Sequence, residues 1–256
     1  MPDLTAHEWM LAALASLGVG VSKAGFPGMA LLHVMIFAFL FGARDSTGIV
    51  LPMLIVGDLG AIGGFYPHTR WDHLRRTLPA ACVGVFVGTF LMRYLSDTAF
   101  APVLGWIILS LVVLHVRQAA VEKRSGGFSQ SVPENPPDLF STAVPLGLLT
   151  GVTTMLANAG GPVLTLYLLG RKVPKLELTA TIAWFFFVLN LFKVPFSVGL
   201  GLIRPDTLAL NAVLVPGIAI GLLFGRWLVH RVPQRLFNQL LLAFAALAAI
   251  RLIGVF

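Results

Sequence analysis

Ten apolar runs with short loops between them occupy most of this 256-residue chain. The runs lie at about 9–22, 29–41, 47–66, 74–92, 99–116, 139–156, 162–170, 178–203, 207–225 and 236–256. Only 11% of the residues are charged, whereas a soluble domain carries about 25%, so a water-soluble fold is excluded. At about 20 residues for each spanning helix, the length allows roughly eight to ten membrane elements. We therefore expect an all-α polytopic membrane protein.

The formal net charge is +7. A basic excess can mark nucleic-acid binding, but in a membrane chain it is typical of cytoplasmic loops, and we expect no nucleic-acid partner. The single cysteine, Cys82, excludes an internal disulfide and a multi-thiolate metal site. No phosphate-binding loop of the Gly-x-x-x-x-Gly-Lys-Ser/Thr type is present, so ATP-driven pumping would need a partner subunit. We expect no metal and no other cofactor. No Lys or Arg precedes Lys23, so we expect the first apolar segment to be retained.

A polar stretch at 117–138 divides the chain into two parts. It contains Ser-Gly-Gly and Pro-Glu-Asn-Pro-Pro, a composition typical of a mobile connection. The sequence thus predicts an N-terminal membrane repeat at 1–116, a cytoplasmic linker at 117–138 and a C-terminal membrane repeat at 139–256.

The two parts match each other at a nearly constant spacing. Lys23-Ala24-Gly25-Phe26-Pro27 corresponds to Asn158-Ala159-Gly160-Gly161-Pro162 at an offset of 135 residues, and the same offset places Asp58 opposite Lys193. Farther along, an offset of 137 relates Pro79, Gly84 and Gly88 to Pro216, Gly221 and Gly225. Three matches in one order predict an internal repeat.

Each half opens on a pair of short apolar segments with a break between them. Segments 9–22 and 29–41 would each be about 20 Å long as helices, less than the ~30 Å hydrocarbon core. The Gly and Pro residues between them prevent a regular helix from continuing. Such a pair is either one broken helix that crosses once or a hairpin of two half-helices that returns to its starting side.

The placement of charge favours the returning hairpin. In that arrangement loops 67–76, 117–138, 171–177 and 226–235 share one face, which holds twelve Lys or Arg residues against four on the other. The positive-inside rule then puts these loops in the cytoplasm and both termini outside. Each half then contributes a hairpin and three crossings. Because the number of crossings is odd, the second half is inverted relative to the first. Inverted repeats with broken helices are typical of secondary transporters, whose substrate site lies near the midplane.

Lys23 and Lys193 are the basic residues that remain inside apolar segments. A charge at membrane depth costs roughly 2.5–3.5 kcal/mol and therefore usually faces a cavity or a partner, although a lysine can also extend to a lipid headgroup. Asp58 is the only acid well inside a predicted span. It is either a fixed partner of Lys193 or a titrating group that couples proton movement to substrate movement.

Neutral hydrogen-bond donors accompany these charges at the two breaks. Half-helix N-termini favour anions, and glycines there let a ligand approach the backbone, unless they serve only close helix packing. Asn158 and Asn190 add side-chain donors. The predicted partner is a small anion, and the predicted substrate-binding residues are Lys23, Gly25, Asn158, Gly160, Gly161, Asn190 and Lys193, with Asp58 as the coupling or ion-pair residue.

Four further polar residues have simpler expected roles. Thr47 and Thr181 begin equivalent helices, which they are expected to cap unless they contact the substrate. His68 and His73 lie in a basic loop and are expected to be solvated.

The sequence resembles the sulfite exporter TauE/SafE family over nearly its whole length. The resemblance is carried by Gly25-Phe26-Pro27-Gly28, Gly147-Leu148-Leu149-Thr150-Gly151, Asn158-Ala159-Gly160-Gly161-Pro162, Asn190-Leu191-Phe192-Lys193-Val194-Pro195, and Pro216 with Gly221 and Gly225. It implies a bacterial or archaeal inner-membrane transporter for sulfite, sulfoacetate or related organosulfonates, and leaves the substrate and direction open. The family is expected to be more glycine-rich where this chain has Lys23-Ala24. The resemblance therefore supports a substrate-binding role more strongly for Asn158, Asn190 and Lys193 than for Lys23.

The main hypothesis is a secondary transporter that moves a small sulfur-containing anion, with a proton as a candidate coupling ion. The alternative class is a membrane-embedded enzyme that acts on a lipid-linked anion. Such an enzyme needs clustered acid/base or metal-ligating groups at membrane depth, and the predicted spans contain no paired carboxylates and no His-Glu-x-x-His. A passive anion channel is a third reading, which the breaks disfavour because they predict a closed midplane site.

Overall fold

The computed structural model describes residues 4–94 apart from Pro27 and Gly28, residues 139–233, and a few single positions elsewhere. The predicted linker at 117–138 and most of the predicted spans at 99–116 and 236–256 lie outside the described residues. Helices are the only regular elements of the described part, which contains no strand. The elements are α1 (Ala6–Lys23), α2 (Ala30–Phe41), α3 (Ala43–Phe65), the short 3-10 helix η2 (Tyr66–His68), α4 (Trp71–Tyr94), α6 (Leu139–Ala157), α7 (Gly160–Gly170), α8 (Lys175–Gly199) and α9 (Pro205–Arg231).

Four of these helices, α3, α4, α8 and α9, are long and apolar enough to cross a membrane. Helix α3, with 23 residues, is about 34 Å long at 1.5 Å for each residue. Helices α2 and α7 have only 12 and 11 residues, so neither crosses a bilayer alone. The expectation of an all-α, multi-pass membrane protein is confirmed.

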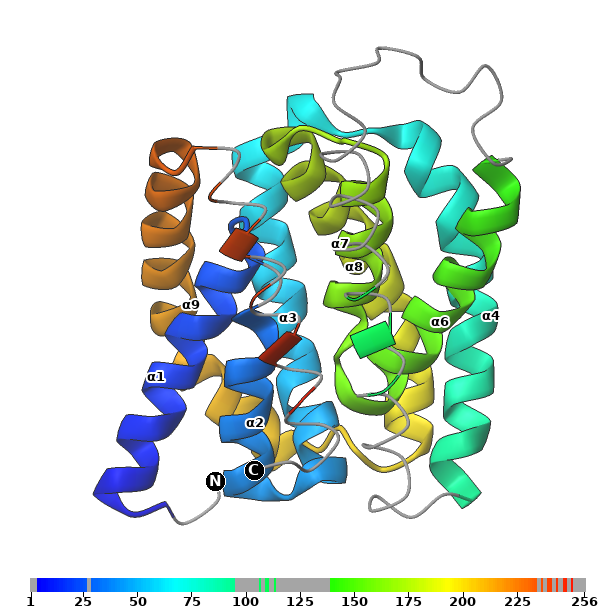
Figure 1. Ribbon diagram of the computed structural model, residues 1–256. Helices are drawn as coiled ribbons and strands as arrows, with labels where there is room; N and C mark the ends of the chain where they lie inside the picture. The colour runs from blue at the N-terminus through cyan, green and yellow to red at the C-terminus, as the bar shows by residue number, and fades with distance from the viewer. Residues whose placement is uncertain are drawn as a thin grey trace.

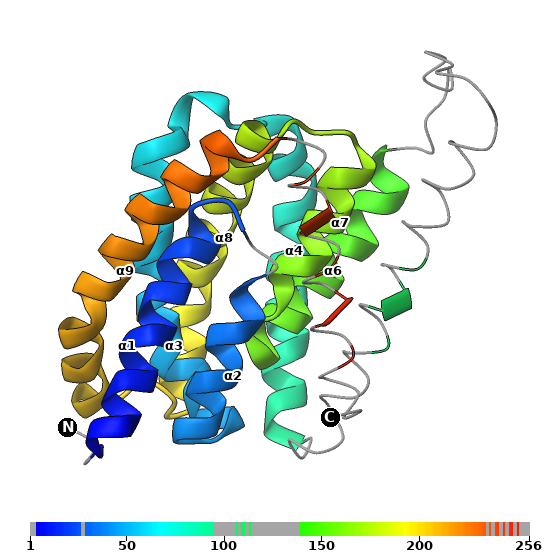
Figure 2. The ribbon, with the colours of Figure 1, turned by 60° about the vertical axis from the view of Figure 1, so that its left-hand side comes forward.

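Each of the short helices α2 and α7 forms a hairpin with the helix before it, and the two hairpins open in opposite directions. Helices α1 and α2 pack against each other, as do α6 and α7. The outer ends of α1 and α2 lie at the end of the molecule where α8 leads into α9, whereas those of α6 and α7 lie at the end where α3 leads into α4 (Figures 1 and 2). We call these the Arg204 end and the Arg70 end, after the residues that precede α9 and α4.

Backbone conformation explains where each hairpin breaks. Gly25 has a φ of 134°, which a residue with a side chain rarely adopts, and Asn158 has a φ of 51°. Asparagine is one of the few non-glycine residues that enter this left-handed region readily. Helix α1 therefore ends at Lys23 and α6 at Ala157.

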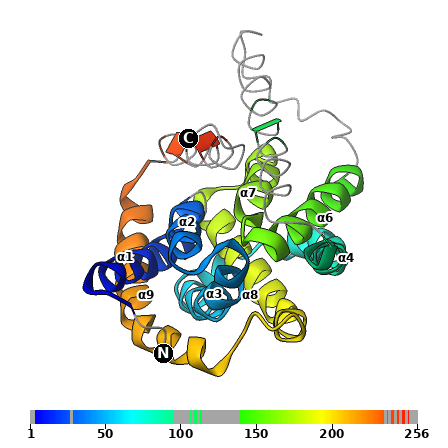
Figure 3. The same ribbon diagram turned by 90° about the horizontal axis from the view of Figure 1, so that it is seen from below.

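Helices α3 and α8 pack together at the centre, between α1 with α9 on one side and α4 with α6 on the other (Figure 3). Each outer pair joins a hairpin helix of one half to the last long helix that the structure describes in the other half. Small residues permit this close packing. A Cβ atom on Gly84 of α4 would overlap the carbonyl oxygen of Leu148 in α6, and one on Gly151 would overlap that of Ala81.

The packing of the outer pairs corrects the predicted offset of 137 for α4 and α9. Gly84 contacts Leu148 and Gly151, whereas Gly217 contacts Ala13 and Ser16, the residues 135 positions before those two. The packing therefore equates Gly84 with Gly217 and not with Gly221. The predicted match was displaced by one helical turn, because glycines repeat every four residues in both helices.

Replacing Gly151 with leucine should destabilise the α4–α6 interface, because the backbone of α4 leaves no room for the side chain. Overpacking of this kind typically costs about 1–3 kcal/mol. The matched control is Gly63→Leu in α3, where an added Cβ atom meets no neighbour within 4 Å. Thermal unfolding in detergent should give a lower midpoint for Gly151→Leu only; equal midpoints for the two variants would contradict the close packing.

Candidate functional site

The first of two buried polar pairs joins Lys23 at the end of α1 to Asp58 in α3. The Lys23 Nζ lies 2.6 Å from Asp58 Oδ1, and the Asp58 side chain is fully buried. Asn190 of α8 donates a hydrogen bond of 2.8 Å from Nδ2 to Asp58 Oδ2. The Lys23 ammonium also lies 5.1 Å from the ring centroid of Phe186, within the range of a cation–π interaction.

This geometry corrects the predicted partner of Asp58. The ion pair forms with Lys23 and not with Lys193. Equivalent positions in the two halves were expected to meet at the pseudo-twofold interface, but the contact lies within one half, where α1 packs against α3. Because its ammonium is held by a buried carboxylate, Lys23 does not extend to a lipid headgroup either.

The second pair joins Lys193 of α8 to Asn158 at the break between α6 and α7. The buried Lys193 Nζ donates to Asn158 Oδ1 and to the carbonyl oxygen of Thr154, each at 2.7 Å, and lies 3.3 Å from Thr154 Oγ1. Asn158 in turn donates from Nδ2 to the Thr47 carbonyl oxygen at 3.1 Å. Among the residues that the structure describes, no carboxylate forms an ion pair with Lys193.

The two pairs occupy corresponding positions. Asp58 follows Lys23 by 35 residues, and Lys193 follows Asn158 by the same 35. In each half, the residue at the helix break therefore contacts the residue 35 positions later, in the next long helix. The polarity differs, because the first half pairs a cation with an anion and the second pairs an amide with a cation. Together the four residues carry a formal charge of +1.

A small cavity of about 30 Å³ lies beside both pairs, which is room for about two water molecules. Lys23, Asn158 and Asn190 line it, whereas Asp58 and Lys193 are not part of its lining. Its lining consists of Ser22, Lys23, Ala30, Leu54, Thr154, Asn158, Gly161, Ile182, Phe186 and Asn190. The part of the chain that the structure describes contains no cluster of three His, Cys, Asp or Glu residues that could hold a metal ion.

The remaining predicted residues divide between the cavity and the packing around it. Gly161 lines the cavity, whereas Gly160 fits closely against Thr150 and Thr154 of α6. Gly25 lies against Val229 and Thr179 and is not part of the cavity lining.

The two threonines expected to cap helices do not do so. The Thr47 hydroxyl donates to the Arg44 carbonyl oxygen at 2.7 Å within α3, and its own carbonyl oxygen accepts from Asn158. The Thr181 hydroxyl donates to the Glu177 carbonyl oxygen at 2.6 Å and accepts from the Arg70 backbone N–H at 2.9 Å. Both helices begin several residues earlier than the apolar runs indicate, because charged first-turn residues were read as loop.

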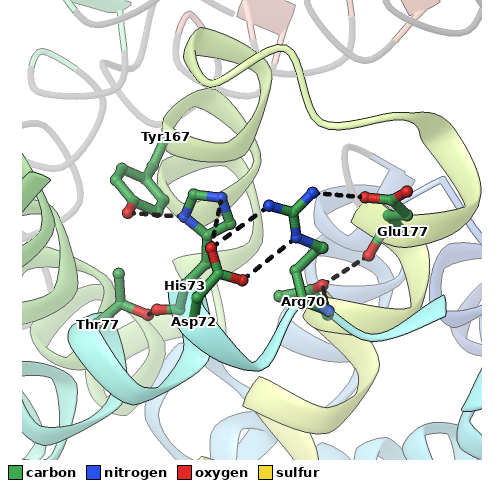
Figure 4. A network of polar contacts seen from close by, with 7 residues as sticks. Arg70, Asp72, His73, Thr77, Tyr167 and Glu177 are labelled. Carbon is green, nitrogen blue, oxygen red and sulfur yellow. Dashed lines mark hydrogen bonds and ion pairs between the residues drawn. The ribbon is translucent and has the colours of Figure 1, made fainter. Parts of the chain in front are cut away.

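A second polar network lies at the Arg70 end, where α4, α7 and α8 meet (Figure 4). Arg70 contacts Asp72 at 3.3 Å and Glu177 at 3.1 Å. Hydrogen bonds that the Arg70 guanidinium donates to these two carboxylates raise its pKa above the ordinary value. His73, which was expected to be solvated, is buried and shares a hydrogen bond of 3.1 Å between Nδ1 and the Tyr167 hydroxyl. That expectation was wrong because His73 belongs to the first turn of α4 and not to a loop.

These features define an all-α, multi-pass membrane protein with a buried, positively charged polar cluster between two broken helix pairs. The profile of the sulfite exporter TauE/SafE family matches residues 12–252. The chain therefore belongs to the sulfite exporter TauE/SafE family, whose members are membrane transporters of small anions. No curated protein and no solved structure gives a significant match to the chain.

Removing one member of the Lys23–Asp58 pair should destabilise the protein more than removing both. A single substitution leaves a buried charge without its partner, which typically costs about 3–5 kcal/mol. Unfolding midpoints of Lys23→Met, Asp58→Leu and the double variant form a double-mutant cycle. The double variant should be more stable than either single variant, whereas strictly additive losses would mean that the two side chains do not interact.

Proposed function

We propose that the protein is a secondary transporter that moves sulfite, sulfoacetate or a related organosulfonate across the cell inner membrane by alternating access. The observation that carries the proposal is Lys193, a buried cation held only by neutral oxygen atoms beside a helix break. A buried charge without a counterion is costly, so the site is most stable when a small anion lies nearby. The family membership supports this substrate class.

The anion would enter the cavity that Lys23, Asn158 and Asn190 line. Lys23 supplies a positive charge there. Asn190 supplies an amide donor once it releases Asp58, and Asn158 supplies one once it releases the Thr47 carbonyl oxygen. Lys193 contributes through Asn158, whose Oδ1 it holds at 2.7 Å. Gly161, at the start of α7, allows the anion to approach the backbone N–H groups of a half-helix.

The size of the cavity supports a moving rather than a fixed site. About 30 Å³ is room for about two water molecules, and an organosulfonate requires the surrounding helices to separate. The hairpins open at opposite ends, and α4–α6 and α1–α9 make corresponding contacts, which supports an inverted repeat. We propose that the halves separate first at one end and then at the other.

Asp58 is the proposed site of proton coupling. Its carboxylate competes with a substrate anion for the Lys23 ammonium, which it holds at 2.6 Å. Protonation of Asp58 would remove that competition and leave Lys23 available to the anion, so one proton and one anion would bind together. Among the described residues, the other charged group that acts on Asp58 is Lys193 of α8, and Asn190 donates to the same carboxylate.

The proposed orientation places the Arg70 end in the cytoplasm and both chain termini outside. Arg70, Lys175 and Arg226 belong to loops or helix ends that lie at this end (Figure 1). Lys175 donates from Nζ to the carbonyl oxygen of Val232, so the α7–α8 and post-α9 segments meet there. The concentration of basic residues supports a cytoplasmic location.

Replacing Lys193 with alanine should reduce saturable uptake of sulfite, sulfoacetate or thiosulfate into proteoliposomes at least tenfold, because the site loses its uncompensated charge. Lys193→Arg, which keeps the charge, should retain more flux than Lys193→Ala. Arg93→Ala is the matched control, because it removes an exposed basic residue near the end of α4. Undiminished flux in a monodisperse Lys193→Ala preparation would refute the assigned role.

Asp58→Asn should abolish the dependence of flux on an imposed pH gradient, because asparagine cannot take up the coupling proton. Wild-type flux should rise when the gradient drives protons in the direction of the anion. The measurement is initial flux with and without the gradient, at saturating anion. A variant that still follows the gradient, or a wild-type flux indifferent to it, would exclude proton coupling through Asp58.

A further inference from the structure

An ion-pair network at the Arg70 end connects the two halves of the chain. Arg70 precedes α4 in the first half, and its Nη1 atom lies 3.1 Å from Oε2 of Glu177 in the second half. Its Nε also contacts Asp72 Oδ1 at 3.3 Å (Figure 4). Glu177 lies in the first turn of α8. The bridge therefore fastens the start of α4 to the start of α8.

A matching network lies at the Arg204 end. Arg204 is the N-cap residue of α9 in the second half, and its Nη2 atom lies 3.9 Å from Oδ2 of Asp45 in the first half. Its Nε lies 3.8 Å from Asp206 Oδ1. Asp45 is in the first turn of α3. This bridge fastens the start of α9 to the start of α3.

The two networks correspond in their arginine and first aspartate, and in the helix position of their second acid. An offset of 134 residues relates both Arg70 to Arg204 and Asp72 to Asp206. Glu177 and Asp45 are each the third residue of their helix. Asp45 begins α3 and Arg70 follows its end, so the networks are separated by about the length of that helix, roughly 34 Å at 1.5 Å for each residue.

The two networks differ in tightness. At the Arg70 end the guanidinium makes a hydrogen bond to Glu177, the Arg70 backbone N–H donates to Thr181, and Trp71 packs on Trp184 with ring centroids 5.4 Å apart. At the Arg204 end the guanidinium lies beyond hydrogen-bond distance from both carboxylates, at 3.8 Å from Asp206 and 3.9 Å from Asp45. One end is thus fastened while its counterpart is loose.

We propose that these networks are a pair of alternating latches, which we call the Arg70 latch and the Arg204 latch. Each holds the two halves together at one end of the substrate site, and tightening of one accompanies loosening of the other. Exposed ion pairs stabilise only weakly, which suits a conformational equilibrium that must stay reversible. The proposal rests on the alternating access described above and identifies the residues that bias it.

The test measures which end of the site is open by labelling a cysteine in the cavity wall. Ser22→Cys supplies the reporter, in a Cys82→Ala background that removes the natural thiol. Glu177→Gln should weaken the Arg70 latch and raise labelling by a membrane-impermeant maleimide from that end at least threefold. Asp45→Asn should do the reverse and favour labelling from the Arg204 end. Oriented right-side-out and inside-out vesicles give the two directions.

Glu8→Gln is the matched control, because Glu8 is a first-turn carboxylate whose hydrogen bonds, among the described residues, are with Thr5 at the N-cap of its own helix. It should leave labelling from both ends unchanged. Shifts in the same direction for Glu177→Gln and Asp45→Asn, or no shift in either folded variant, would overturn the latches. Labelling requires no substrate, so opposite shifts in a protein that carries no sulfur-containing anion would refute the substrate assignment and leave the latches standing.

A second measurement uses transport itself. Arg70→Cys combined with Glu177→Cys, again in the Cys82→Ala background, should be cross-linked by a short bifunctional methanethiosulfonate reagent, which spans the space of the two long side chains and holds the Arg70 end closed. Flux should stop on cross-linking and return when a reductant cleaves the cross-link. Continued flux through the fully cross-linked protein, established by mass spectrometry, would show that this end does not need to open and would overturn the proposal.

Discussion

Two lysines buried in an apolar helical bundle impose the constraint that the rest of the arrangement satisfies. Lys23 is neutralised by Asp58, which also accepts from Asn190. Lys193 is held by the Asn158 amide oxygen and by the last turn of α6 through the Thr154 carbonyl oxygen. The carboxyl end of a helix carries partial negative charge, so each lysine lies where a hairpin helix ends. The helix breaks therefore provide sites that buried cations require.

The two halves meet this requirement with the same geometry and with unequal charge. In both, the residue at the break contacts the residue 35 positions later. One half is neutral and the other keeps a net positive charge, so a single small anion would compensate the site. The same correspondence extends outward to the inter-half packing at Gly84 and Gly217 and to the bridges of Arg70 and Arg204. The polar cluster and the ion pairs at both ends therefore support the proposed inverted repeat.

Much of this plan is predictable from the sequence, because apolar runs and helix-breaking residues act locally. The two hairpins, their breaks and the buried positions of Asp58 and Lys193 follow from such patterns. The partner of Asp58 does not, because an offset of 135 residues relates positions by symmetry and says nothing of which ones touch. Helix starts rich in charge, such as Trp71-Asp72-His73, were taken for loops, which hid His73 and the Arg70 network. Asp45 and Glu177 are each the third residue of a helix, and their equivalence can be recognised only once the first residue of each helix is known.

The most direct test of the central claim is to locate a bound anion at the two breaks. Crystals grown with selenite, a heavier analogue of sulfite, allow the selenium atom to be found from its anomalous scattering. The account predicts one strong peak in the cavity, within hydrogen-bond distance of Lys23 or Asn158 and with the surrounding helices farther apart. A peak only among the basic residues of the loops, or no peak at a saturating selenite concentration, would contradict an anion site between the two halves.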